Sequence, residues 1–234
     1  MRGTVGPIAF ALLTVGSLDR VGEETARVPA PSTSGRCASC HLPNGFGRPE
    51  SASLAGLPAI YIEQQLADYR KGVRKSPAPA TAAEPRMDAI AATVSGNDLR
   101  ALGEYFSSIK YTGWVRVVET PEVVGRIVEV PDDSASGFVA YVPAGSLRRG
   151  EALVTTGGGG RTVRCALCHG EDVKGIGPVP SLAGRSPTYQ VRQLYDMKHG
   201  MRRGLGADLM KATVARLSEL DMIAIAAYTA SRQP

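Results

Sequence analysis

Two copies of one five-residue pattern constrain this chain more than any other feature. Residues 37–41 read CASCH and residues 165–169 read CALCH, so both segments fit C-x-x-C-H. The chain has 234 residues, four cysteines and three histidines, and these two segments contain every cysteine and two of the histidines. Any fold for this sequence must therefore explain two equivalent clusters, each with two thiols and one imidazole.

Three kinds of chemistry use paired cysteines. Disulfides within each pair would close very small loops and would not require a histidine beside each pair. Zinc bound by C-x-x-C…C-x-x-C requires both pairs to meet at one metal and leaves both histidines unused. Covalent haem c uses all six residues, because the thiols bond to the porphyrin and the adjacent histidine ligates the iron. We expect two covalently attached haem c groups, bound by Cys37, Cys40, His41, Cys165, Cys168 and His169.

The similarity between the two halves extends beyond the pentapeptides. The segment SLAGLPAIYIEQQLADYRKGVR starts at Ser53, and SLAGRSPTYQVRQLYDMKHGMR starts at Ser181, the same 128 positions on. From Met87 and Met210 onward, the two copies align with an offset of 123 positions. The first copy therefore has five extra residues, which we place within RKSPAPATAAEP. The chain is therefore read as a tandem duplication of one haem-binding unit.

The repeat predicts the same helices in each copy. A short helix carries each pentapeptide, and later helices are expected over residues 59–72 and 97–109 in the first copy and 188–200 and 219–231 in the second. Ser95 and Ser218 are expected to cap the last helices, with Asp98 and Asp221 in their first turns. The predicted fold is mainly α, with two tandem helical haem domains joined by a short insert that contains strands.

A methionine in each copy is the predicted second axial ligand of the iron, because a soft thioether suits a high-potential electron carrier. The first copy offers Met87, and the register of the repeat then selects Met210. Met197 and Met222 are expected to pack in the core, Met201 is a weaker alternative, and His199 is expected to face solvent. The backbone carbonyls of Ala52 and Pro180 are expected to orient the two ligand histidines. The predicted iron ligands are thus His41, Met87, His169 and Met210.

Residues 1–29 resemble a secretory leader, because Arg2 precedes a short apolar stretch that no clean cleavage site follows. No apolar run reaches the ~20 residues that span a bilayer. The net charge of +5 comes from basic residues that are neither dense nor mixed with aromatic residues, so nucleic-acid binding is not expected.

Residues 112–145 are expected to form an insert between a first domain at 30–111 and a second at 146–234. The stretches WVRVVET, GRIVEV and GFVAYV have the valine-rich, alternating pattern of short strands. The first copy lacks a good helix before its pentapeptide, so one interpretation is that the insert covers the face left open there, with Trp114 as its anchor. A loosely packed connector is the alternative.

The chain resembles the class I cytochromes c in its C-x-x-C-H, S-L-A-G and Y-x-x-x-Q-L motifs and in the methionine eight residues before the last helix cap. In duplicate these motifs resemble the dihaem cytochrome c4 group. The resemblance implies a periplasmic electron carrier, not an enzyme, that passes single electrons between redox protein partners through two haems. Alternatives are an electron-wiring subunit of a larger oxidoreductase complex, including one associated with a membrane respiratory complex, or a dihaem enzyme such as a peroxidase.

Overall fold

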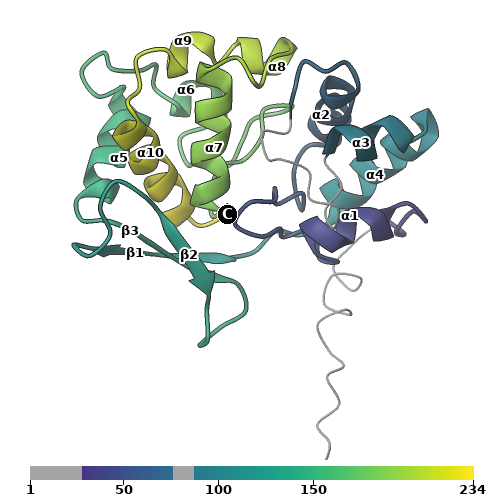
Figure 1. The fold of residues 1–234 in the computed structure, drawn as a ribbon, viewed down its shortest axis with the longest axis horizontal. Helices are drawn as coiled ribbons and strands as arrows, with labels where there is room; N and C mark the ends of the chain where they lie inside the picture. Colours follow the sequence, from purple (N-terminus) through teal and green to yellow (C-terminus); the bar gives the residue numbers. More distant parts are fainter. Residues whose placement is uncertain (1–27, 76–86) are drawn as a thin grey trace, which may run out of the picture.

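The computed structural model describes residues 28–75 and 87–234. Figure 1 shows two groups of helices side by side, with a small sheet beneath the second group. The predicted leader at 1–29 lies almost wholly outside the described residues, and the extra residues of the first copy fall mainly on 76–86, also outside them. None of the described helices is long and apolar enough to cross a membrane.

The described part of the first unit has four helices around one apolar cluster. The last two helices of this unit are joined by a short turn that ends at Ser95. Buried side chains of Leu57, Ile62, Leu102 and Phe106 belong to the cluster, which lies between the second and fourth helices. The helices are α1 (Ser34–His41), α2 (Ala59–Arg70), α3 (Met87–Thr93) and α4 (Gly96–Ser108).

The second unit repeats this arrangement and adds a helix before the pentapeptide. That added helix crosses the last helix at Gly150, where a Cβ atom would overlap the carbonyl oxygen of Ala224. Glycine is therefore required for the two backbones to approach this closely. The helices are α5 (Ser146–Thr156), α6 (Ala166–His169), α7 (Pro187–Lys198), α8 (Leu205–Asp208), α9 (Lys211–Val214) and α10 (Glu219–Ser231).

The predicted helices are confirmed to within two residues at each end, as are both caps. The Ser95 hydroxyl accepts a hydrogen bond from Asp98 N at 3.1 Å, and the Ser218 hydroxyl accepts one from Asp221 N at 3.2 Å. In the second copy the Asp221 carboxylate also accepts from Ser218 N at 2.9 Å, which completes a capping box. Serine at these positions therefore fixes where each last helix begins.

The insert folds into a three-stranded sheet of β1 (Val115–Thr120), β2 (Val128–Pro131) and β3 (Phe138–Pro143). The strand order is β1-β3-β2, with β1 parallel and β2 antiparallel to β3. Val139, Ala140 and Val142 of the central strand are at most 4% exposed. This burial excludes the loosely packed connector.

The sheet packs mainly on the second unit, which corrects the expectation that it covers the first. Strand β1 lies against α10, and the Glu119 carboxylate accepts a hydrogen bond from Leu147 N at the start of α5. Trp114 is the anchor to the first unit, as predicted. Its indole Nε1 donates to Gly47 O at 3.1 Å and its ring meets that of Phe46 edge to face. The sheet therefore bridges the two units instead of replacing a missing helix.

Candidate haem sites and the interface between them

The first pentapeptide lies on α1 and ends at a buried histidine. The His41 ring is 7% exposed, and its Nδ1 lies 2.7 Å from the carbonyl oxygen of Ala52. Because a carbonyl only accepts, Nδ1 must carry the hydrogen, which leaves the Nε2 lone pair for a metal. Burial lowers the pKa of His41, so the ring is held in the neutral, ligating form.

The second pentapeptide has the same geometry on α6. The His169 ring is also 7% exposed, and its Nδ1 lies 2.8 Å from Pro180 O. Burial likewise lowers its pKa. The two carbonyls predicted from the sequence to orient the histidines are therefore the ones that contact them.

A tight loop after each histidine brings that carbonyl into place. In the first copy Gly45, at φ +69°, accepts hydrogen bonds from Leu54 N and Ala55 N through its carbonyl. Val173 holds the matching position in the second copy at φ +53°, and its carbonyl accepts the same pair of bonds. A β-branched residue is strained in this conformation. The Val173 side chain is 1% exposed within the apolar cluster, so burial offsets the strain.

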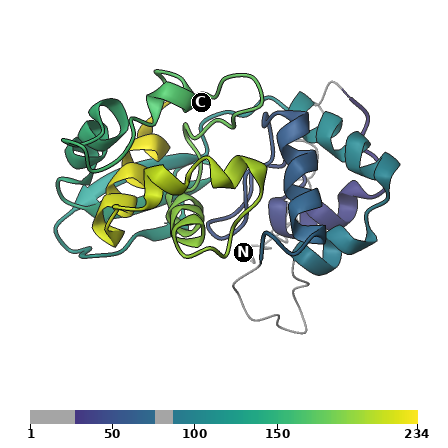
Figure 2. The same cartoon turned by 90° about the horizontal axis from the view of Figure 1, so that it is seen from above.

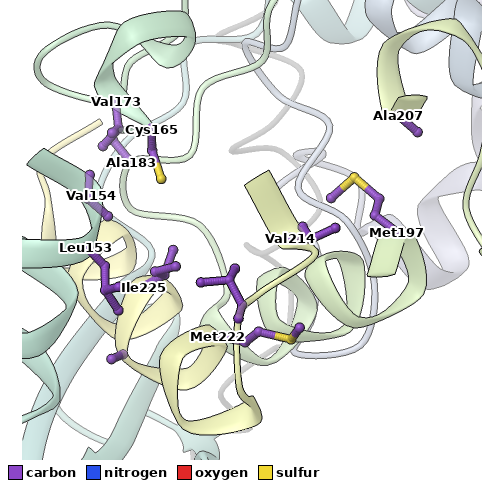
Figure 3. Packing of buried hydrophobic residues seen from close by; sticks show 12 residues of the cluster. Leu153, Val154, Cys165, Val173, Ala183, Met197, Ala207, Val214, Met222 and Ile225 are labelled. Atoms are coloured by element: carbon purple, nitrogen blue, oxygen red, sulfur yellow. The ribbon is translucent and has the colours of Figure 1, made fainter. Parts of the chain in front are cut away.

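Cys165 lies inside the apolar cluster of the second unit. Figure 3 shows it beside Val173 and Ala183, with Val214 and Met197 on the opposite side of the view. Cys168, one helical turn later, is exposed. One thiol of the pair thus faces the apolar interior and the other faces the surface, as expected where a flat apolar cofactor enters from the edge.

The structure keeps the two cysteine pairs apart, on α1 and at α6. All four thiols are free. Among residues 28–75 and 87–234, no three His, Cys, Asp or Glu side chains meet as a metal site, so the geometry does not support the zinc alternative.

Met87 and Met210 occupy equivalent places in the two units. Met87 is the first residue of α3 and Met210 immediately precedes α9, and each is partly buried against the apolar cluster of its own unit. Met197 and Met222 are 8% and 1% exposed and pack in the core, as predicted. The predicted solvent exposure of His199 is also confirmed, since its ring stacks on Tyr195 at the surface.

Sequence reasoning missed the contact between the two units. Arg74 donates hydrogen bonds across it to the Tyr189 hydroxyl at 2.8 Å and to Gln193 Oε1 at 3.0 Å. Arg202 donates to the Tyr61 hydroxyl and to Gln65 Oε1, both at 2.9 Å. Each of these residues and its counterpart are 128 positions apart, so the contact has approximate twofold symmetry.

The backbone repeats that symmetry. Arg74 and Arg202 pair as an isolated antiparallel bridge, flanked by Lys75 N donating to Met201 O at 2.9 Å and Arg203 N donating to Val73 O at 2.8 Å. The sequence feature that could have indicated this contact is the identical Tyr, Gln and Arg at matching positions of the two copies. Figure 2 shows the two units meeting along this boundary.

The interface contains three buried positive charges, on Arg74, Arg185 and Arg202, which are 6%, 6% and 9% exposed. All the hydrogen bonds that these side chains make within the described residues go to neutral oxygen atoms. Arg202 Nε is buried and has no hydrogen-bond partner among the described residues.

Burial lowers the pKa of Arg185, whereas the hydroxyls of Tyr189, Tyr69 and Tyr61 outweigh burial and raise that of Arg74. Buried cations of this kind require compensating negative charge. The buried Asp196 carboxylate interacts with Arg74 and Arg202 and offsets part of this charge. Haem c would bring two further carboxylates per group, which fits the remaining positive charge.

No protein-family model matches the chain. It is 27% identical over 208 residues to a protein named thiosulfate dehydrogenase electron acceptor from Thiomonas intermedia strain K12, covering 87% of this chain and 81% of that relative. It is also 39% identical over 70 residues to cytochrome c-554(548) of Halomonas halodenitrificans, which covers 30% of this chain and 84% of the relative. The chain belongs to the dihaem class I cytochromes c.

Further similarities connect this dihaem cytochrome with the cytochrome c4 group. Cytochrome c4 of Azotobacter vinelandii is 33% identical over 111 residues, covering 46% of this chain and 48% of the relative. A cytochrome c4 structure from Acidithiobacillus ferrooxidans superposes with a TM-score of 0.64 at 24% identity, over 85% of this chain and 99% of the other. The chain therefore has the cytochrome c4 fold, carries two covalently bound haem c groups and is an electron-transfer protein.

A second solved structure contains this fold within a longer chain. It is the thiosulfate dehydrogenase TsdBA of Marichromatium purpuratum, at TM-score 0.63 and 27% identity. The match covers 92% of this chain but only 39% of that one.

Proposed function

We propose that this cytochrome accepts electrons from a thiosulfate-oxidising dehydrogenase in the periplasm and passes them singly to a later acceptor. The observation that carries this proposal is the similarity to a thiosulfate dehydrogenase electron acceptor over 87% of the chain. The presence of this fold in the thiosulfate dehydrogenase TsdBA of Marichromatium purpuratum supports the same donor.

The proposal assigns each haem to one unit. Cys37 and Cys40 would form the thioether bonds to the first haem, and Cys165 and Cys168 those to the second. His41 and Met87 would ligate the first iron, and His169 and Met210 the second. The domains are assigned to residues 30–111 and 146–234, with the insert at 112–145 between them. Haem c, when bound, supplies a one-electron Fe(III)/Fe(II) couple.

The protein contributes burial, orientation and charge. Ala52 O and Pro180 O hold the histidine rings at a fixed tautomer, at 2.7 and 2.8 Å. The apolar clusters would keep water away from a bound haem. The buried arginines between the units connect them by hydrogen bonds and would stabilise the acid groups of haems bound nearby.

The test is reduction of the haem-loaded protein by purified thiosulfate dehydrogenase and thiosulfate, followed in the visible haem bands by stopped flow. Complete reduction of both haems, dependent on both enzyme and thiosulfate, is expected. If the enzyme with thiosulfate leaves the haems oxidised while ascorbate reduces them, the proposed donor is wrong.

A second candidate is a wiring subunit fixed within a larger oxidoreductase. The Marichromatium chain favours it, because there the fold is part of a chain more than twice as long. A stable complex that survives gel filtration from the native host would support this candidate, and a freely exchanging monomer would support the mobile carrier.

A further inference from the structure

One hydrogen bond in the second unit joins the segment before the pentapeptide to the segment after Met210. The Thr162 hydroxyl donates to the carbonyl oxygen of Thr213 at 2.7 Å. Thr162 lies three residues before Cys165, and Thr213 lies three residues after Met210. The bond therefore connects the two stretches of chain between which the second haem would lie, the histidine side and the methionine side.

The Thr162 end of this bond is fixed by the rigid part of the unit. Thr162 N donates to Gly157 O at 3.1 Å, and Gly157 N donates to Leu153 O at 3.1 Å in the last turn of α5. Cys165 N donates to Val154 O of the same helix at 3.0 Å. Because α5 packs closely on α10, the Thr162 hydroxyl has a fixed position relative to the pentapeptide.

The methionine side is built from two helices of about one turn each, so it has little rigidity of its own. Met210 lies between α8 and α9, and each of these helices has four residues. Helices this short depend on tertiary contacts. Thr213 is 9% exposed, and its neighbour Val214 is 1% exposed within the apolar cluster. Figure 3 shows Val214 opposite Cys165, so the bond to Thr213 acts on the wall that faces the pentapeptide.

The Thr162 hydroxyl has one hydrogen to donate, and the distances assign it to Thr213. The other carbonyl within reach is that of Val163, at 3.3 Å. Thr213 O lies in the last turn of α9, where backbone carbonyls have no partner within the helix. The hydroxyl therefore satisfies a carbonyl that the short helix cannot.

The first unit joins its two sides differently. Ser34 and Ile90 occupy the positions that match Thr162 and Thr213. There, Arg36 Nη1 donates to the Thr93 hydroxyl at 3.1 Å in an exposed contact. The described part of this unit has no helix before α1 that could fix the donor as α5 fixes Thr162.

We propose that Thr162 is a positioning residue for the second haem, whose hydroxyl holds α9 towards the pentapeptide and so keeps Met210 within bonding reach of the iron. The proposal rests on the proposed function, in which Met210 ligates the second iron. A thioether that is already held in place loses less entropy on binding than one on a free loop. Removing the hydroxyl should therefore weaken the methionine ligand without changing which residues bind the haem.

The experiment measures how readily added imidazole displaces methionine from the oxidised, haem-loaded protein. In this exchange the Fe–S bond breaks, an Fe–N bond forms and no electron is transferred. Thr162→Val removes the hydroxyl at nearly constant shape, and Thr162→Ser keeps it. The matched control is Thr156→Val, because the Thr156 hydroxyl donates to Ala152 O at 2.6 Å within α5. Absorption spectra follow the loss of the thioether-to-iron band, and a redox titration gives both potentials.

Thr162→Val is expected to raise the imidazole affinity of one haem by about two- to tenfold, the factor that corresponds to the net contribution of one hydrogen bond. It should also lower the potential of that haem, since the thioether favours ferrous iron. Thr162→Ser and Thr156→Val should match the wild type. An unchanged affinity in Thr162→Val, or an equal rise in Thr162→Ser or Thr156→Val, would overturn the proposal.

Met210→Ala separates this proposal from the ligand assignment on which it rests. If Met210 ligates the iron, Met210→Ala alone raises the imidazole affinity, and adding Thr162→Val has no further effect. If Met210→Ala changes nothing, the ligand assignment is wrong and the positioning role fails with it. If Met210→Ala raises the affinity but Thr162→Val does not, the ligand stands and only the positioning role is wrong. A Thr162→Val effect that persists in the Met210→Ala background also overturns that role. Since no dehydrogenase is used, none of these results depends on the proposed donor.

Discussion

The reciprocal arginines between the units should behave as a coupled pair on mutation. In the structure, Gln65 Oε1 accepts from both Arg74 Nη1 at 2.7 Å and Arg202 Nη2 at 2.9 Å. Gln193 Oε1 likewise accepts from both arginines, at 3.0 and 3.1 Å. Replacing one arginine by methionine therefore leaves each amide oxygen with a donor, and among the described residues only the tyrosine facing that arginine loses its donor.

The magnitude follows from the number of buried acceptors left without a donor. An unpaired buried polar group costs about 1–3 kcal/mol. Arg74→Met affects one such group, the Tyr189 hydroxyl, and Arg202→Met affects the Tyr61 hydroxyl, so each should lower the free energy of unfolding by about 1–3 kcal/mol. The double variant leaves two tyrosines and two glutamines without these donors and should lower the free energy of unfolding by about 4 kcal/mol or more, at least about 2 kcal/mol beyond the sum of the single losses.

The assay is urea unfolding of the four haem-loaded proteins followed by circular dichroism. The matched control is Arg192→Met, because Arg192 also crosses between the units, to Glu50 Oε2 at 2.7 Å, but as a partly exposed ion pair. That variant should lose less than about 1 kcal/mol. A double variant whose loss equals the sum of the single losses would show that the arginines act independently, and the shared-acceptor argument would be refuted.

Three further predictions concern the sites and the charges. Met210→Ala should let carbon monoxide bind one iron, while the other iron, ligated by Met87, stays closed to it. The carbon monoxide difference spectrum measures this binding, and a spectrum without the new band would exclude Met210 as a ligand. Burial raises the pKa of Glu129 from its ordinary 4.5, so the charged form destabilises the fold above that value; Glu129→Gln should raise the free energy of unfolding by about 1 kcal/mol at pH 7, and the gain should vanish below pH 4.5. Burial would raise the pKa of Asp221, but its hydrogen bonds to Ser218 and Arg149 lower it overall, so its stabilising effect is present above 3.8 and is lost as the pH falls further. Asp221→Asn should therefore cost about 1–3 kcal/mol at pH 7, and the matched Asp98→Asn, at an exposed cap, about 0.5 kcal/mol; thermal unfolding of both variants at pH 7 and pH 3 checks the sign.

The helices and the candidate haem sites could be predicted because they depend on residues close together in the sequence. C-x-x-C-H places two thiols and an imidazole on one helical turn, and Ser95 and Ser218 mark where the last helices begin through contacts three residues away. The repeat then selected Met210 over three other methionines, two of which the structure buries in the core. Local chemistry and register together were sufficient for these elements.

The position of the insert could not be predicted, because alternation in a strand indicates that one face is buried but not what buries it. The valines of 115–142 formed strands as expected, yet their partner is α10 and not the first unit. Trp114 was identified as an anchor because a lone tryptophan in a connector has few other uses. The burial of Arg74 and Arg202 could not be predicted either. Equal spacing in the two copies shows that both contain the same residues, but it does not show that those residues face each other.

The duplication itself explains why one region of the two copies stayed alike while another diverged. A contact with twofold symmetry uses the same residues from each side, so a change to Tyr61, Gln65 or Arg74 would alter only half of a matched arrangement and leave a buried partner unpaired. The surfaces beside the two cysteine pairs lie outside that contact and have diverged: Val163, Leu167 and Ile176 of the second copy correspond to Gly35, Ser39 and Arg48 of the first.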